Sequence, residues 1–319
     1  MKTKIGNITL NSPLMNASGV FCRTEEELIK LDESSFAGCI ISKSCTIEKR
    51  EGNQPPIYWD NASNGNNLSI NSSGLPNLGY KFYIDKNLTT KLNKKPYFVS
   101  VSGLTGEDNL TIISELIKNN NIAGVELNLS CPNVIGKPQI GYDFEAMDNL
   151  LSKVNVIIQA KKTEDSKFNF GLKLPPYFDF SHFDIASNII NKYEVDTITC
   201  INSLGNGLVV DPILEKVVIK PKGGFGGIGG AFVKPVALAN VRKFSELTNC
   251  DVIGCGGIKS GLDAFEHILC GAKAVQIGTQ FYMEKHGVFE RIYNELQEIM
   301  IEKGYKTLDD FCGKLKVFD

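Results

Sequence analysis

A short segment with the sequence Asn-Leu-Ser-Cys-Pro-Asn, residues 128–133, carries the side chains best suited to chemistry. Its cysteine, Cys131, follows a predicted strand, is flanked by asparagines and precedes proline, which is not a typical packing position. The amides of Asn128 and Asn133 can each donate and accept hydrogen bonds, so they suit a planar polar ligand. The Cys131 thiol can act as a base or a nucleophile if its pKa is suitable. The alternative is an inert thiol on a loop.

Other polar residues and glycines also come directly after predicted strands. Because the carboxyl ends of parallel barrel strands meet on one face, these residues are expected to line one pocket. The pairs Gly256-Gly257 and Gly278-Thr279 would leave backbone N–H groups free near helix N-termini, which suits a phosphate. The alternative for these pairs is ordinary tight turns. The other residues at strand ends are Lys43, Asn128, Lys173, Asn202 and Ser203.

The glycine run at residues 224–229 fits the pattern G-x-G-x-x-G of dinucleotide-binding folds. Such a fold needs an acidic residue at the end of the next strand. The next predicted strand, 251–255, instead ends in cysteine and is followed by two glycines. We therefore reject a Rossmann fold and interpret these glycines as points of close backbone approach or as chain turns.

The elements that position these residues are short apolar runs that alternate with helical patterns. Alternation of this kind indicates parallel strands joined by crossover helices. Eight such strands without a dividing linker predict one (β/α)8 barrel domain over residues 1–319. The predicted strands cover residues 14–17, 39–43, 97–101, 124–129, 170–174, 196–201, 251–255 and 274–277. The predicted helices cover residues 25–31, 108–119, 144–162, 181–191, 236–247, 262–269 and 288–303.

Two segments interrupt the alternation. Residues 44–79 are rich in Asn, Ser, Gly and Pro, and on composition alone they could be a disordered insertion. Residues 202–230 hold a strand-like stretch at 216–220 and the glycine run. In a barrel, such extra loops usually cover the C-terminal face, where the site lies.

Composition excludes several classes of protein. Of 319 residues, 42% are apolar, which is enough for a large core, and the net charge of −2 gives no nucleic-acid footprint or basic membrane patch. No run approaches the ~18 apolar residues that a membrane span needs. The N-terminus runs into core-like sequence without a signal region, so we expect a cytoplasmic protein.

The cysteines and histidines give no sign of a metal centre. There are nine cysteines, an odd number, and none forms a C-x-x-C pair, so disulfides, zinc sites and iron–sulfur sites are not expected. Most of these cysteines fit small buried hydrophobic positions. The three histidines, His182, His267 and His286, lie in no recognisable motif, so a catalytic Cys–His pair is not supported. We expect His182 and His267 on helix surfaces.

Taken together, the ordered motifs carry a family resemblance that runs nearly end to end. The chain resembles the class 1A dihydroorotate dehydrogenases, and the set of motifs is specific although no single one is decisive. The motifs lie at residues 16–19, 42–44, 48–52, 69–77, 126–133, 173–179, 202–207, 220–222 and 277–279.

The resemblance implies an FMN-containing barrel that oxidises dihydroorotate to orotate in pyrimidine synthesis. Cys131 would take a proton from C5, and a hydride would pass from C6 to flavin N5. Class 1A resemblance also implies a homodimer with fumarate as electron acceptor, which gives succinate. The substrate residues would be Lys43, Asn71, Ser72, Ser73, Gly74, Leu75, Asn128, Asn133, Asn202 and Ser203. The FMN residues would be Ala17, Ser18, Gly19, Lys43, Ser44, Asn128, Lys173, Ile201, Gly230, Gly256, Gly257, Gly278 and Thr279.

Two departures from the family motif and three rival interpretations accompany this resemblance. Ser73 stands where the motif has Met, and Cys45 stands where it has Ser or Thr, so Cys45 is either a second thiol near the flavin or a packed neutral one.

One rival is class 1B, which passes electrons through an iron–sulfur flavoprotein to NAD. The others are a flavin enzyme acting on another dihydropyrimidine and a non-catalytic ligand-binding barrel. Class 2 would have a serine base and an N-terminal membrane extension.

Overall fold

The computed structural model describes residues 1–61, 67–130, 139–162 and 167–318, and a parallel barrel lies at its centre. Its strands are β3 (Leu14–Asn16), β4 (Ile40–Ile41), β7 (Tyr97–Val101), β8 (Gly124–Asn128), β9 (Asn169–Lys173), β10 (Thr197–Cys200), β15 (Asp251–Cys255) and β16 (Ala272–Ile277). They pair in the order β3-β16-β15-β10-β9-β8-β7-β4, and a parallel bridge between Met15 and Cys39 joins the two edges of the sheet. The (β/α)8 prediction is confirmed, and each predicted strand is present to within a few residues.

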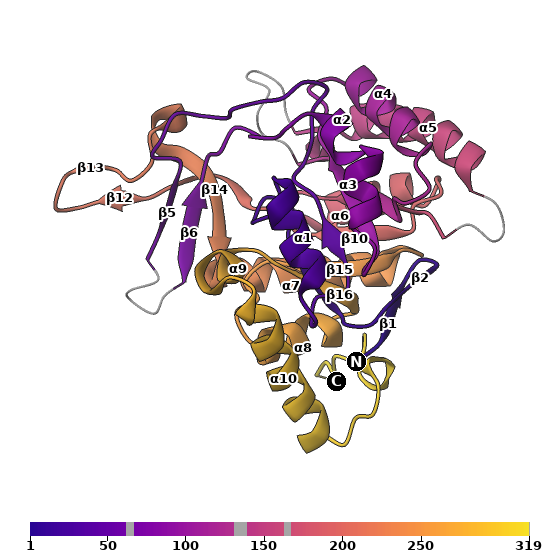
Figure 1. Ribbon diagram of the computed structural model, residues 1–319. Coiled ribbons are helices and arrows are strands. Elements are labelled where there is room, and N and C mark those ends of the chain that lie inside the picture. Colours follow the sequence, from indigo (N-terminus) through magenta and orange to yellow (C-terminus); the bar gives the residue numbers. More distant parts are fainter. Residues whose placement is uncertain (62–66, 131–138, 163–166, 319) are drawn as a thin grey trace.

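Helices follow the strands and cover the outside of the barrel (Figure 1). Every predicted helix is present. Their bounds are α1 (Glu25–Glu33), α4 (Gly106–Leu116), α5 (Phe144–Lys161), α6 (Phe180–Ile190), α7 (Lys234–Leu247), α8 (Gly261–Leu269) and α10 (Gly287–Glu302). Helix α4 begins earlier than predicted because Thr105 and Asp108 form a reciprocal capping box at its start. Three shorter helices were not predicted, since they are too short to show a helical period: α2 (Tyr80–Tyr83), α3 (Lys86–Lys91) and α9 (Thr279–Glu284).

Alternation along the strands divides the core into an inner and an outer part. Ile40 packs in the large cluster beneath the helices, while its neighbour Ile41 packs inside the barrel with Met15 and Phe98. This follows from the two-residue period of a strand, which points successive side chains to opposite faces. The hairpin of β1 (Thr3–Ile5) and β2 (Ile8–Leu10) adds its apolar residues to the inner cluster, so it closes the N-terminal end of the barrel. Within the described residues, no helix is both long enough and apolar enough to cross a membrane.

Asn16 joins the first and second barrel strands through its side chain. Its Nδ2 donates to the Ile41 carbonyl at 2.8 Å, and its Oδ1 accepts from the Ile41 N–H at 2.9 Å. Asn16 is fully buried, and β4 is only two residues long. The amide therefore replaces a pair of backbone ladder bonds at the place where the barrel closes.

We expect Asn16→Ala to lower the free energy of unfolding by about 1–3 kcal/mol, because the buried N–H and C=O of Ile41 would lose their partners. Urea denaturation of the flavin-free protein measures this change. The control is Asn93→Ala, since Asn93 is exposed and should cost little. Equal urea midpoints for the two variants would show that the Asn16 amide does not support the closure.

The two insertions pair with each other to form a second, antiparallel sheet beside the barrel (Figure 1). Its strands are β5 (Tyr58–Asp60), β6 (Leu68–Asn71), β11 (Leu204–Leu208) and β14 (Phe225–Gly230), in the order β11-β14-β6-β5. Composition alone allows disorder for residues 44–79, whereas the family resemblance implies that residues 61–77 are an active-site loop. The described part of this segment is ordered by pairing with a distant segment, and residues 71–75 line the cavity described below. The strand-like stretch at 216–220 is shorter than expected: only β13 (Lys216–Val217) is a strand, and it pairs with β12 (Val210–Asp211).

The glycine run lies on and beside β14, which confirms the rejection of a Rossmann fold. Close approach of neighbouring chain segments explains two of these glycines. A Cβ at Gly226 would lie 2.6 Å from the Asn71 carbonyl oxygen, and a Cβ at Gly227 would lie 2.2 Å from Ser203 Oγ. Larger residues would push β6 and the segment after β10 away from β14.

Candidate active site

The ends of the barrel strands and the second sheet line one cavity of about 430 Å³. This volume lies in the usual range of small-molecule sites, about 300–1,000 Å³. Every predicted site residue that the structure describes lines this cavity. They are Ala17, Ser18, Gly19, Lys43, Ser44, Asn71, Ser72, Ser73, Gly74, Leu75, Asn128, Lys173, Ile201, Asn202, Ser203, Gly230, Gly256, Gly257, Gly278 and Thr279. Cys131 and Asn133 lie outside the described residues, and Ser130, the last described residue before them in the sequence, lines the cavity.

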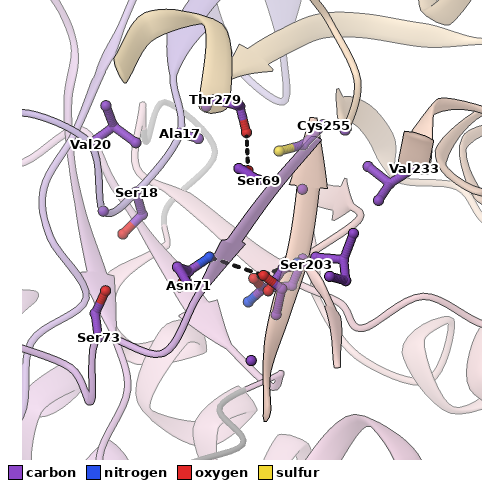
Figure 2. A pocket seen from close by; sticks show the side chains of 18 of the residues that line it. Ala17, Ser18, Val20, Ser69, Asn71, Ser73, Ser203, Val233, Cys255 and Thr279 are labelled. Atoms are coloured by element: carbon purple, nitrogen blue, oxygen red, sulfur yellow. Dashed lines mark hydrogen bonds between the residues drawn. The ribbon is translucent and has the colours of Figure 1, made fainter. Parts of the chain in front are cut away.

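Side-chain amides on one part of the cavity wall are oriented by hydrogen bonds. Asn202 Nδ2 donates to Asn128 Oδ1 at 3.2 Å, and that oxygen also accepts from the Ser130 N–H at 3.0 Å. Asn71 on β6 donates its Nδ2 to the Gly227 carbonyl on β14 at 3.3 Å, and Ser203 also lies beside Gly227 (Figure 2). An amide wall of this kind can donate to and accept from a flat polar ring.

Lys43 brings a positive charge to the cavity beside the backbone of Gly19. A Cβ placed at Gly19 would lie 3.0 Å from Lys43 Nζ, and Gly19 has a φ of +113°, which side chains rarely adopt. The Lys43 N–H donates to the Cys22 carbonyl at 2.8 Å, which fixes the chain that carries the lysine. An anionic ligand in the cavity would meet this ammonium.

Lys173 lies on the floor of the cavity and is almost fully buried, with 6% of its surface exposed. Its Nζ donates to Gln276 Oε1 at 2.5 Å. Gln276 and Glu126, which sequence reasoning missed, also line the cavity. A charged or amide residue inside an otherwise apolar strand was the signal that could have identified them, because such groups are rarely buried without a partner.

Backbone donors gather where β15 and β16 end. Gly256 and Gly257 have φ values of +127° and +76°, and within the described residues neither N–H donates to a protein acceptor. The N–H of Thr279, at the start of α9, has no protein acceptor there either. The Thr279 hydroxyl lies 2.8 Å from that of Ser69, and Figure 2 shows this pair bridging β6 and α9. Free N–H groups beside hydroxyl groups can bind a phosphate.

His267 lies behind this loop, and the prediction that it sits on a helix surface is wrong. It is fully buried, and its Nε2 lies 3.1 Å from the Gly256 carbonyl oxygen. Burial lowers the pKa of His267 to about 4, so the ring is neutral near pH 7 and donates through Nε2. Gly254 makes room for the ring, since a Cβ there would lie 2.4 Å from Nδ1. The surface position predicted for His182 is confirmed.

The two departures from the family motif have different environments. Cys45 is fully buried away from the cavity lining, and burial raises the pKa of its thiol to about 12, so it is a packed neutral group. Ser73 lines the cavity, and a larger side chain at this position would reduce the space. Ser73 is therefore the departure that bears on the shape of the pocket.

Comparisons with known proteins agree with one another. Residues 1–300 match the family model described as dihydroorotate dehydrogenase. Two similar proteins are each named dihydroorotate dehydrogenase A (fumarate). The one from Lactococcus lactis subsp. lactis (strain IL1403) is 49% identical over 322 residues, and the one from L. lactis subsp. cremoris (strain MG1363) is 48% identical over 322 residues; each match covers 99% of both chains. The crystal structure of DHODH from Eimeria tenella in complex with ferulenol has a TM-score of 0.78 at 19% identity, covering 98% of this chain and 87% of that one, and shows likeness of fold.

Proposed function

Since the chain belongs to the dihydroorotate dehydrogenase family, we propose that it oxidises dihydroorotate to orotate in pyrimidine synthesis, with fumarate as the electron acceptor. The observation that carries this proposal is the convergence of the expected substrate and cofactor residues on one cavity. These residues come from separate strands and from both insertions. A shared cavity is what one reaction site requires.

The residues around the cavity fit FMN as the cofactor. The N–H groups of Gly256, Gly257 and Thr279, which have no acceptor in the part of the chain that the structure describes, suit its phosphate. The Lys173 ammonium suits the part of the ring that gains negative charge on reduction. When bound, FMN supplies a two-electron acceptor for the hydride that leaves C6 of the substrate. The cation at Lys173 favours that transfer by stabilising the reduced ring electrostatically.

The substrate is an anion with an imide-like ring, and the chain offers complementary groups. Lys43 provides a cation, while Asn71, Asn128 and Asn202 provide oriented amides. Residues 72–75 line the same cavity. In our proposal the Cys131 thiolate removes the C5 proton of the substrate. The C6 hydride leaves at the same time or next. The two electrons of the broken C5–H bond form the C5=C6 bond of orotate.

We further propose that the enzyme is a cytoplasmic homodimer. Support for a self-association surface comes from the arm formed by β12 and β13, which reaches outward from the second sheet (Figure 1). Val210, Ile213 and Leu214 on this arm are 54%, 89% and 58% exposed. Apolar residues exposed to this degree on one arm are typical of a surface that a partner covers.

An anaerobic mixing experiment on the purified yellow protein tests the function. We expect dihydroorotate to bleach the flavin absorbance, and fumarate but not NAD to restore it. Bleaching without recovery by fumarate would keep the substrate and overturn the acceptor, in favour of the class 1B arrangement. Flavin-loaded protein that dihydroorotate does not bleach would overturn the substrate assignment and favour another dihydropyrimidine.

A further inference from the structure

At the base of the cavity, four polar side chains from four barrel strands form one buried hydrogen-bonded chain. Lys173 on β9 donates to Gln276 Oε1 on β16 at 2.5 Å. Gln276 Nε2 donates to Glu126 Oε2 on β8 at 2.7 Å, and Thr199 Oγ1 on β10 donates to the same oxygen at 2.8 Å. All four residues are buried, Gln276 completely. The amide of Gln276 therefore stands between a cation and a carboxylate.

Charge fixes the direction of each hydrogen bond in this chain. The ammonium of Lys173 can only donate, so the amide oxygen of Gln276 must face it and the amide NH2 must face Glu126. Glu126 Oε2 accepts from both Gln276 Nε2 and Thr199 Oγ1. Glu126 Oε1 is buried and has no hydrogen-bond partner among the described residues. A carboxylate buried in this position is stabilised by the opposite charge of Lys173.

The titratable groups that face Lys173 lie on three strands: Glu126 on β8, Cys255 on β15 and Cys200 on β10. Burial alone lowers the pKa of Lys173, but Cys255 and Glu126 outweigh it and raise that pKa above its ordinary value. Burial raises the pKa of the Cys200 thiol far above its usual range, so Cys200 stays neutral. Cys255 lines the cavity itself (Figure 2). Glu126 is thus the one carboxylate among the described groups that face Lys173.

We propose that Glu126, acting through Gln276, is a positioning residue that keeps Lys173 charged and fixed in place in both redox states of the flavin. This inference rests on the proposed function, because it takes Lys173 to face a bound flavin. With Glu126 present, reduction of the flavin takes up no proton at Lys173. Without Glu126, the described titratable groups left facing Lys173 are the thiols of Cys255 and Cys200, and neither is a carboxylate. Burial then lowers the pKa of the lysine, which for a fully buried lysine can reach about 5–6. It would then lose its proton in the oxidised protein and regain it when reduction adds negative charge to the flavin.

The test is the midpoint potential of the bound flavin against pH, measured by equilibration with redox dyes in wild type and Glu126→Gln. The variant keeps the size of the side chain and removes the charge. In Glu126→Gln, we expect the midpoint potential of the flavin to fall more steeply with pH than in wild type. Above the pKa of Lys173, the ratio of reduced to oxidised flavin at a fixed potential should fall by an additional tenfold per pH unit, which is about 30 mV per unit for a two-electron couple. Gln276→Met should give the same steeper slope, because it breaks the link, and it carries the test if Glu126→Gln does not fold.

Thr197→Val is the matched control. Thr197 lies on the same strand as Thr199 and is also buried, but its hydroxyl binds Asn169 at 2.9 Å and does not line the cavity. The wild-type slope in this control together with a steeper slope in both test variants supports the proposal. The proposal for Glu126 is overturned if Glu126→Gln and Gln276→Met both keep the wild-type slope. It is also overturned if only Cys255→Ala gives a steeper slope. Neither outcome affects the proposed oxidation of dihydroorotate. Wild-type protein that takes up no flavin overturns both the proposed function and this inference.

Discussion

Cys131→Ala is expected to slow the reduction of bound flavin by dihydroorotate by about 10²- to 10⁴-fold, which is the usual contribution of a positioned general base. The substrate C5 proton would then have to pass to water. Orotate affinity should change little, since the other groups that we assign to the substrate stay in place. Stopped-flow mixing without oxygen measures the first turnover directly and is independent of the electron acceptor. A thiolate base also predicts that the wild-type rate rises with pH toward the thiol pKa, ordinarily about 8.5.

The control for Cys131 is another cysteine that is remote from the cavity. Cys312 is partly exposed, and its thiol donates to the Ala272 carbonyl near the other end of β16, so Cys312→Ala should keep the wild-type rate. Cys131→Ser tests the chemistry further, because a hydroxyl is a much weaker acid and should support a slower reaction. Reduction of Cys131→Ala as fast as wild type would remove Cys131 from the mechanism.

The barrel was predictable because its signal is local. Each strand is a short apolar run, and each helix shows its own period, so alternation alone indicates parallel strands. The pairing of the two insertions was not predictable, because β6 and β14 are about 160 residues apart in the chain and neither has a pattern that specifies a partner. The hydrogen bonds by which Asn16 closes the barrel were not predictable either. The sequence shows only that an asparagine is present, and not whether its amide binds a ligand or a neighbouring strand.

The site was predictable in part for a geometric reason. Parallel barrel strands bring their carboxyl ends together, so residues such as Lys43 and Asn202 could be placed on one face before any distance was known. His267 was misplaced because a helix histidine carries no mark of burial. Glu126 and Gln276 were passed over because they lie within strands and not after them.

The barrel interior explains why these two residues are in strands. Near the N-terminal end the inward side chains are apolar, as with Met15 and Phe98, and they pack against the N-terminal hairpin. Nearer the cavity the inward positions are Glu126, Lys173, Thr199 and Gln276, linked by hydrogen bonds. The apolar layer stabilises the fold, while the polar layer supports charge at the site at a cost in desolvation.

Among the substitutions considered, Lys173→Met should cause the largest loss of stability, because the desolvation of the buried Glu126 carboxylate would no longer be offset. We expect the free energy of unfolding of the flavin-free protein to fall by about 3–5 kcal/mol, because the variant leaves the Glu126 carboxylate buried without its counter-charge. Adding Glu126→Gln to Lys173→Met should recover a large part of this loss, since an uncharged amide needs no cation. Urea denaturation of the two single variants and the double variant gives the coupling between the residues.

The control for this cycle is Lys153→Met. Lys153 forms an exposed ion pair with Glu107 at 3.4 Å, and such pairs contribute about 0–1 kcal/mol. If Lys173→Met costs no more than Lys153→Met, the buried chain does not hold a net ion pair. If the double variant is as unstable as the sum of the two single variants, Glu126 and Lys173 act independently, and Gln276 transmits nothing between them. Strong coupling in the flavin-free protein would show that the barrel itself, without any ligand, maintains the charge at Lys173.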